Sequence, residues 1–115
     1  MTERCIIIWN ENLIYIGNYE ELRPGKGYPS MRDYISDSPY VGQGKIVYYL
    51  LHGKECGVFA KRAKDIFTGE PLPMESVGMS DGEYIWYCTL AYYVKKYNLR
   101  LPREFENKIL KKKLL

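Results

Sequence analysis

The chain has 115 residues, of which 46% are apolar, 15% aromatic and 27% charged, and its formal net charge is +3. This composition excludes a disordered chain, because disordered segments contain few aromatic residues and bury too little surface to offset the entropy of ordering. The chain also lacks the run of about 20 apolar residues that a membrane span needs and the apolar leader of a signal peptide. We therefore expect a single compact domain over residues 1–115, located in the cytoplasm and away from membranes.

The N-terminal segment predicts a β-hairpin followed by a loop. The apolar runs Cys5–Trp9 and Leu13–Ile16 are separated by three polar residues, a spacing typical of two strands and a short turn. Residues 24–29 contain two prolines and two glycines, which interrupt regular structure. We therefore expect an exposed loop over residues 20–29.

Two helices are expected next. Ser30 is followed three positions later by Asp33, a pattern typical of a helix N-terminus, and this short helix must end before Pro39. The run Lys45–Gly53 follows two glycines and ends on a glycine in the position of a helix C-cap. Its isoleucine, valine and tyrosine residues also suit a strand, but the flanking glycines favour a helix.

The segment between residues 55 and 86 predicts strands and turns. Residues 55–60 alternate in polarity as a strand does, and residues 65–70 indicate a turn that two prolines follow. Residues 77–79 and 84–86 flank the Asp-Gly pair at 81–82, which is a strong turn signal. These patterns predict a strand, a turn and a second strand.

Two helices are expected at the C-terminal end. From residue 86 the apolar period changes to that of a helix, and Pro102 suits the first turn of a second helix that directs Phe105 and Ile109 toward the core. The stripe of the first helix comprises Trp86, Leu90, Tyr93, Val94 and Tyr97. The predicted fold is α+β, with a small antiparallel sheet and a C-terminal helical hairpin packed on it.

Charge is distributed unevenly along the chain. Residues 93–115 contain eight Lys or Arg and two Glu, whereas residues 1–92 contain nine Lys or Arg and twelve Asp or Glu. The lysines at 111–113 would stabilise the negative end of the last helix dipole, which explains part of this cluster. Bases interleaved with aromatic residues are also typical of nucleic-acid-binding surfaces. The basic C-terminal end is therefore an alternative functional site.

The sequence contains no catalytic or metal-binding motif. His52 is the only histidine, and the cysteines at positions 5, 56 and 88 lack the spacing of zinc or redox sites, so reduced thiols are expected. Asp81 and Glu83 could form an acid pair, but an Asp-Gly turn explains Asp81 without chemistry. The glycines beside Lys26 and Lys45 lack P-loop spacing and indicate tight turns. We therefore expect neither catalysis nor a cofactor.

Twelve tyrosines are the main peculiarity of the composition. Tyrosine combines a large apolar ring with a polar hydroxyl and few rotatable bonds, so it suits binding surfaces as well as the edges of cores. Three tyrosines fall outside the helical stripe, and an acidic loop precedes them in the chain. The candidate partner-binding residues are Tyr84, Tyr87, Tyr92, Glu20 and Glu21.

One block carries a resemblance to a known class of proteins. It comprises Asp-Gly-Glu-Tyr-Ile-Trp at 81–86, Leu-Ala-Tyr-Tyr-Val at 90–94, Tyr97 and Leu-Pro-Arg-Glu-Phe at 101–105. Over residues 78–110 the chain resembles small bacterial proteins that are similar to immunity proteins of polymorphic or contact-dependent toxin systems. The resemblance implies a protein that neutralises a toxin by binding it, and it transfers no functional residue. The sequence pI near 8.7 departs from the acidic character common among nuclease inhibitors.

The leading hypothesis is a non-enzymatic protein-binding module, with an immunity protein as its specific form. The first alternative is a nucleic-acid-associated accessory protein that uses the basic C-terminal end. The second is a small enzyme or ligand-binding domain whose site is assembled from loops. The sequence predicts neither the partner nor the oligomeric state.

Overall fold

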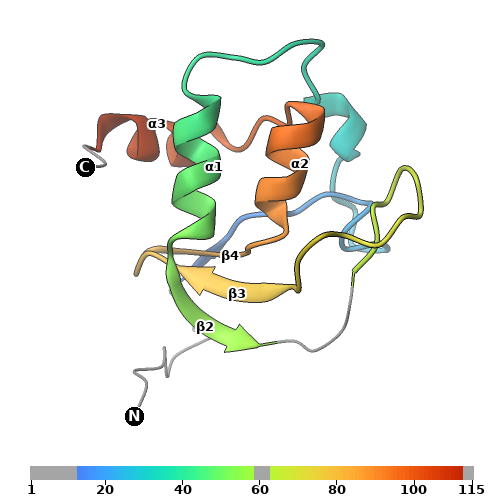
Figure 1. Cartoon of the computed structure of the whole chain (residues 1–115), viewed down its shortest axis with the longest axis horizontal. Coiled ribbons are helices and arrows are strands. Elements are labelled where there is room, and N and C mark those ends of the chain that lie inside the picture. Colours follow the sequence, from blue (N-terminus) through green and yellow to red (C-terminus); the bar gives the residue numbers. More distant parts are fainter. Residues whose placement is uncertain (1–12, 59–62, 113–115) are drawn as a thin grey trace.

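The computed structural model of the chain describes residues 13–58 and 63–112. Within these ranges helices and a small sheet form an α+β arrangement, which confirms the predicted fold class (Figure 1). In chain order the elements are β1 (Ile14–Tyr15), the 3-10 helix η1 (Met31–Tyr34), α1 (Gln43–Leu51), β2 (Lys54–Val58), β3 (Val77–Ser80), β4 (Tyr84–Tyr87), α2 (Leu90–Tyr97) and α3 (Arg103–Lys111).

The sheet is mixed rather than wholly antiparallel. Its strand order is β1-β4-β3-β2, and β2, β3 and β4 are antiparallel neighbours, as expected. Strand β1 instead runs parallel to β4, with Ile14 opposite Tyr84. A local pattern shows which residues are extended, but the direction of pairing depends on where the rest of the chain places them. The predicted hairpin partner of this strand, Cys5–Trp9, lies outside the described residues.

The predicted Asp-Gly turn joins β3 to β4. The carboxylate oxygen Oδ1 of Asp81 accepts hydrogen bonds from the backbone N–H groups of Glu83 at 2.9 Å and Tyr84 at 2.8 Å. Gly82 has a φ of 98°, a conformation that side chains disfavour and glycine adopts freely. The hydrogen bonds of this turn therefore support the antiparallel pairing of β3 and β4, the two strands that it joins.

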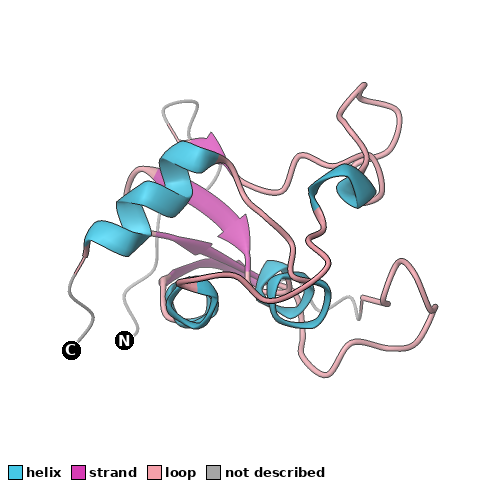
Figure 2. Ribbon diagram, turned by 90° about the horizontal axis from the view of Figure 1, so that it is seen from above, coloured by secondary structure: helices cyan, strands magenta, loops and turns pink. Residues whose placement is uncertain are grey.

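Helices α1 and α2 stand side by side above the sheet and run in opposite directions (Figure 1). The two predicted C-terminal helices, α2 and α3, are both present, and both pack against α1. Figure 2 shows α1 and α2 nearly end-on, with α3 to one side of them and seen along its length. The predicted helical pairing therefore differs in detail, because α1 is the neighbour that the two C-terminal helices share.

The start of α2 corrects the helical prediction at residue 86. Trp86 lies in β4, and the helix begins only at Leu90. Both side chains nevertheless face the core, so a spacing of four residues arose from two different elements and imitated a helical turn. Trp86 is fully buried, and its indole N–H donates to the carbonyl oxygen of Leu50 at 2.9 Å. This bond ties β4 to the end of α1.

The predicted core of α3 is confirmed, because Phe105 and Ile109 are fully buried. The Phe105 ring lies with its centroid 4.7 Å from that of Tyr84 and 5.4 Å from that of Trp86. The ring of Tyr49 on α1 completes the group at 6.1 Å from Phe105. This aromatic cluster joins α1, α3 and the sheet.

Both cysteines within the described ranges are buried, at 1% exposure for Cys56 and 6% for Cys88. Cys88 is a free thiol, so the expectation of a reduced thiol is confirmed at this position. Among the described helices, none combines the length and the apolar character needed to cross a bilayer.

Gly53, between α1 and β2, is expected to tolerate no larger residue. A Cβ atom added there would lie 2.9 Å from Cζ2 of Trp86 and 3.2 Å from the backbone oxygen of Ser80. We expect Gly53→Ala to lower the free energy of unfolding by about 2 kcal/mol, because an overfilled core forces neighbours to move. Urea denaturation followed by circular dichroism measures the change.

The matched control for this prediction is Gly44→Ala within α1. A Cβ atom at Gly44 meets no atom within 4 Å, so alanine there should raise the free energy of unfolding by about 0.5–1 kcal/mol through its higher helix propensity. Shifts of the same sign for the two variants would contradict the close contact inferred at Gly53.

Candidate functional site

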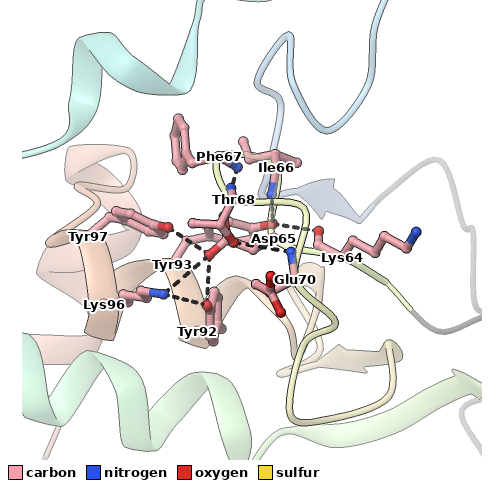
Figure 3. Close-up of polar contacts among 10 residues, drawn as sticks. All are labelled: Lys64, Asp65, Ile66, Phe67, Thr68, Glu70, Tyr92, Tyr93, Lys96 and Tyr97. Carbon is pink, nitrogen blue, oxygen red and sulfur yellow. Dashed lines mark hydrogen bonds and ion pairs between the residues drawn. The ribbon is translucent and has the colours of Figure 1, made fainter.

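A buried carboxylate anchors the loop of residues 64–70 to α2 (Figure 3). The hydroxyl groups of Tyr92 and Tyr97 each donate a hydrogen bond to Oδ2 of Asp65 at 2.7 Å. Tyr93, between them on α2, bonds through its hydroxyl to the backbone of the same loop. Three tyrosines of one helix therefore hold this loop, and with Asp65 and Lys96 they are called here the Asp65 cluster.

The second oxygen of Asp65 is bonded to its own loop. Oδ1 accepts hydrogen bonds from the N–H groups of Phe67 at 2.7 Å and Thr68 at 3.1 Å, and Nζ of Lys96 lies 3.7 Å from Oδ2. Burial raises the pKa of this carboxyl, but the hydrogen bonds from Tyr97, Tyr92 and the two amides outweigh it and hold the pKa at about 2. Asp65 is therefore a charged anchor and a poor proton acceptor at neutral pH.

A groove of about 510 Å³ opens between α1, α2 and the segment before β3. Most of the side chains that line it are apolar, and two lysines and a tyrosine of α2 form its polar wall. We call it the α1–α2 groove; its lining residues are Val47, Leu51, Pro73, Met74, Ala91, Tyr92, Lys95 and Lys96. Its volume lies within the roughly 300–1,000 Å³ of ligand-binding pockets.

The Asp65 cluster and the α1–α2 groove share two residues, Tyr92 and Lys96. The ammonium group of Lys96 donates to the hydroxyl of Tyr92 at 3.1 Å, and that hydroxyl donates to Asp65. The buried carboxylate therefore fixes the orientation of the tyrosine ring in the groove wall before any partner binds. Such preorganisation lowers the entropic cost of binding.

Asp81 and Glu83, which the sequence allowed as an acid pair, both contact Lys108 of α3. Its ammonium group lies 3.0 Å from Oδ2 of Asp81 and 2.7 Å from Oε1 of Glu83. The hydroxyl of Tyr49 also donates to Asp81 at 2.6 Å. Burial raises the pKa of Asp81, but the hydrogen bonds from Tyr49, the backbone and Lys108 outweigh this effect and hold the pKa below its usual value. These carboxylates hold α3 against the β3–β4 turn, an arrangement that stabilises the fold.

Part of the basic C-terminal charge is neutralised within the molecule. Arg100 donates two hydrogen bonds to the buried carboxylate of Glu106, at 2.7 and 3.2 Å. Lys96 and Lys108 face Asp65 and the β3–β4 turn, respectively. Arg103 remains exposed at the start of α3. These internal pairs reduce the positive charge that the C-terminal end could offer to nucleic-acid phosphates.

The three candidate tyrosines do not form one patch. Tyr84 is 8% exposed and packs in the aromatic cluster, so it presents little surface to a partner. Tyr87 is half-buried beside Tyr15, with 6.2 Å between ring centroids, and it lines a separate hollow. Tyr92 is half-buried and lines the α1–α2 groove. Of the three, Tyr92 is the one that lines the groove, together with Lys95 and Lys96.

The candidate acids Glu20 and Glu21 lie in the loop before η1. Glu20 is exposed and accepts the N–H of Gly25 at 3.4 Å. Glu21 accepts the hydroxyl of Ser30 at 2.5 Å and the N–H of Met31 at 2.6 Å, so it orders the entry to η1. Both carboxylates therefore support the loop, and their contact with a partner stays a prediction.

His52 lies at the exposed end of α1. Its ring stacks on that of Tyr48 with 3.8 Å between centroids, and Nδ1 lies 2.8 Å from the backbone oxygen of Tyr48. Among the described residues, no group of three or more His, Cys, Asp and Glu side chains could hold a metal ion. The glycines at 25, 27 and 42 have positive φ angles, as expected of turns.

Sequence reasoning missed Asp65 and most of the apolar floor of the groove. One local signal was available, since Tyr92 and Lys96 are four residues apart and face the same side of a helix. The turn at 65–70 also indicated that Asp65 could accept backbone N–H groups. The position of Leu51 and Met74 beside α2 had no local signal.

The α1–α2 groove combines an apolar floor with a positively charged wall, and the Asp65 cluster fixes that wall in place. These properties suit the binding of a partner better than proton transfer, because the buried carboxylate beside the groove is already fully hydrogen-bonded. Comparison of the chain with protein families, curated proteins and solved structures finds no match.

Proposed function

We propose that the protein is a non-enzymatic protein-binding module whose partner docks in the α1–α2 groove. The groove itself is the observation that carries the proposal, because it joins exposed apolar surface to an oriented tyrosine and two lysines. Leu51 is 38% exposed, and it lines the groove together with the buried Ala91. Apolar side chains in such a hollow lose water when a partner covers them, and this burial favours association.

Photo-crosslinking in the native host tests the docking site. A photoreactive residue at position 51 should capture one defined polypeptide, whereas the same residue at position 41 should not. Val41 is the matched control, because it is 94% exposed and lies outside the groove. Recovery of the protein only as a free monomer, with no adduct specific to position 51, would count against a protein partner.

The specific form of this proposal is an immunity protein that neutralises a toxin. The resemblance of residues 78–110 supports it, and this block includes the groove residues Ala91 and Tyr92. A toxin gene is then expected next to this one in the host genome. A cytoplasmic location remains part of the prediction.

A growth assay tests neutralisation. Cells that express the neighbouring toxin should survive with the wild-type protein and die with Leu51→Arg, because a guanidinium group in the groove cannot be buried without a partner charge. Val41→Arg adds the same charge outside the groove and should retain protection of at least about half the wild-type survival. Equal protection by both variants would place the toxin contact elsewhere.

A further inference from the structure

Two helices border the α1–α2 groove. Its walls are two antiparallel helices of nine and eight residues, each about 12–14 Å long. Val47 and Leu51 are one helical turn apart on α1, and Met74 lies at the edge with an unbranched, adaptable side chain. A hollow of this length accommodates about two to three turns of an amphipathic helix.

The charge along the groove has a direction. On α2, Lys95 follows Ala91 by four residues and Lys96 follows Tyr92 by four, so each lysine lies one turn farther along the helix. Since α2 starts at the end of β4, the groove is apolar near the sheet and positive toward the end of α2. The negative end of the α2 dipole also stabilises the two lysines electrostatically.

Lys95 supplies the positive charge of the wall that is most available to a partner. None of the residues that line the groove is acidic, and Lys95 is exposed. The Lys96 side chain is also 49% exposed, but its ammonium group contacts Tyr92 and lies 3.7 Å from Oδ2 of Asp65, which offsets part of its charge. Nearby carboxylates from a partner would therefore complement the groove, as opposite potentials do across protein interfaces.

We propose that the groove receives an acidic amphipathic helix of the partner protein. Its apolar side chains would rest near Leu51 and Ala91, and carboxylates one turn away would meet Lys95 and Lys96. This inference rests on the proposed protein-binding function and adds the chemistry of the partner. It also fits a basic chain that resembles immunity proteins but lacks the acidic character expected toward a nuclease.

Two other occupants fit the groove less well. A second copy of this chain offers no acidic helix among its described elements, since α3 carries more Lys and Arg than Glu, and a symmetric contact would place lysines against lysines. A nucleic acid would satisfy the lysines but leave the apolar floor around Leu51 without a complementary surface.

A pair of labelled helical peptides tests the assignment on the full-length protein. Both are about 14 residues long with leucines at i, i+4 and i+7 spacing, and they differ only in glutamates or lysines at the flanking positions. Fluorescence anisotropy at low salt should show the glutamate peptide binding at least about 10-fold more tightly than the lysine peptide. Nuclear magnetic resonance should place its contacts at the methyl groups of Val47 and Leu51.

Charge reversal provides the matched comparison. Lys95→Glu should weaken binding of the glutamate peptide about 5-fold, whereas Lys26→Glu, in the exposed loop outside the groove, should change it less than about 2-fold. The assignment is overturned by absent saturable binding, by equal affinity for the two peptides, or by equal effects of the two reversals. It is also overturned, in favour of nucleic acid, if single-stranded DNA displaces the peptide and needs Lys95.

If crosslinking from position 51 captures a polypeptide but Lys95→Glu leaves that capture unchanged, the groove binds a protein and the acidic assignment is wrong. If position 51 captures nothing and neither peptide binds, both proposals fail.

Discussion

Replacing Asp65 with alanine is expected to lower the free energy of unfolding by about 3 kcal/mol. The substitution removes the common acceptor of Tyr92, Tyr97 and two backbone N–H groups, and the carboxylate that it deletes is only 1% exposed. Groups that lose their partner inside a protein keep the cost of leaving water without the compensating bond. Urea denaturation followed by circular dichroism measures the loss.

Asp37→Ala is the matched control, because Asp37 is exposed in the loop before α1. Its effect should stay within about 0.5 kcal/mol, as for most surface substitutions. Tyr97→Phe on its own should cost about 1 kcal/mol and should cost much less when Asp65 is already alanine. Additive effects of Asp65→Ala and Tyr97→Phe would show that the two side chains do not act together.

The contribution of Asp65 is also expected to depend on pH. Its pKa in the folded protein is about 2, below the ordinary value of 3.8, so the folded state favours the ionised form. The stabilisation is therefore fully present above about pH 4 and is lost as the pH falls from about 4 to about 2. The difference in unfolding free energy between the wild type and Asp65→Asn should shrink over this range.

Other carboxyls also titrate in acid, and the comparison with Asp65→Asn removes their common contribution. Glu21 and Asp81 have lowered pKa values as well, since hydrogen bonds to each outweigh its burial. Their effect is shared by the wild type and the variant. A difference that stays constant from about pH 5 to pH 2 would mean that Asp65 is not ionised in the folded state.

Phe105→Ala is expected to have the largest effect of any single substitution proposed, about 4 kcal/mol of unfolding free energy. The ring is fully buried between Tyr49, Tyr84 and Trp86, which come from α1 and β4, so its removal opens a cavity where three elements meet. Denaturation followed by circular dichroism and by tryptophan fluorescence should give the same reduced midpoint.

Two further variants show whether the cavity causes the loss. Phe105→Leu keeps most of the buried volume and should cost about 1.5 kcal/mol. Leu110→Ala removes a partly exposed side chain from the same helix, 39% exposed, and should cost less than about 1 kcal/mol. If Leu110→Ala costs as much as Phe105→Ala, the helix as a whole and not its aromatic contact controls stability.

The elements of this fold could be predicted where a local pattern is strong. The Asp-Gly pair at 81–82 forms the expected turn because Asp81 bonds to N–H groups only two and three residues away. The short helix after Ser30 also appears, with the Ser30 side chain as its cap. The helix before Gly53 is present, but the predicted glycine cap is wrong, because His52 is the C-cap and Gly53 is instead packed against Trp86. Burial of Tyr93, Phe105 and Ile109 followed from helical periodicity.

The same local patterns misplaced features that depend on distant segments. Trp86 matched the helical stripe but lies in a strand, because a strand and a helix in succession can both direct side chains to one core. Strand β1 pairs in parallel with β4, which no pattern near Ile14 could indicate. Tyr84 was a surface candidate and is buried because α3 covers it with Phe105.

The fold class, the turn at 81–82 and the aromatic character of the C-terminal half follow from local patterns in the chain. The contact of Asp65 with Tyr92 and Tyr97, 27 and 32 residues farther along, and the groove between α1 and α2 emerge only in the folded molecule. Periodicity, caps and turns depend on neighbours within a few residues, whereas hydrogen bonds between Asp65 and the tyrosines of α2 form only when the whole core packs.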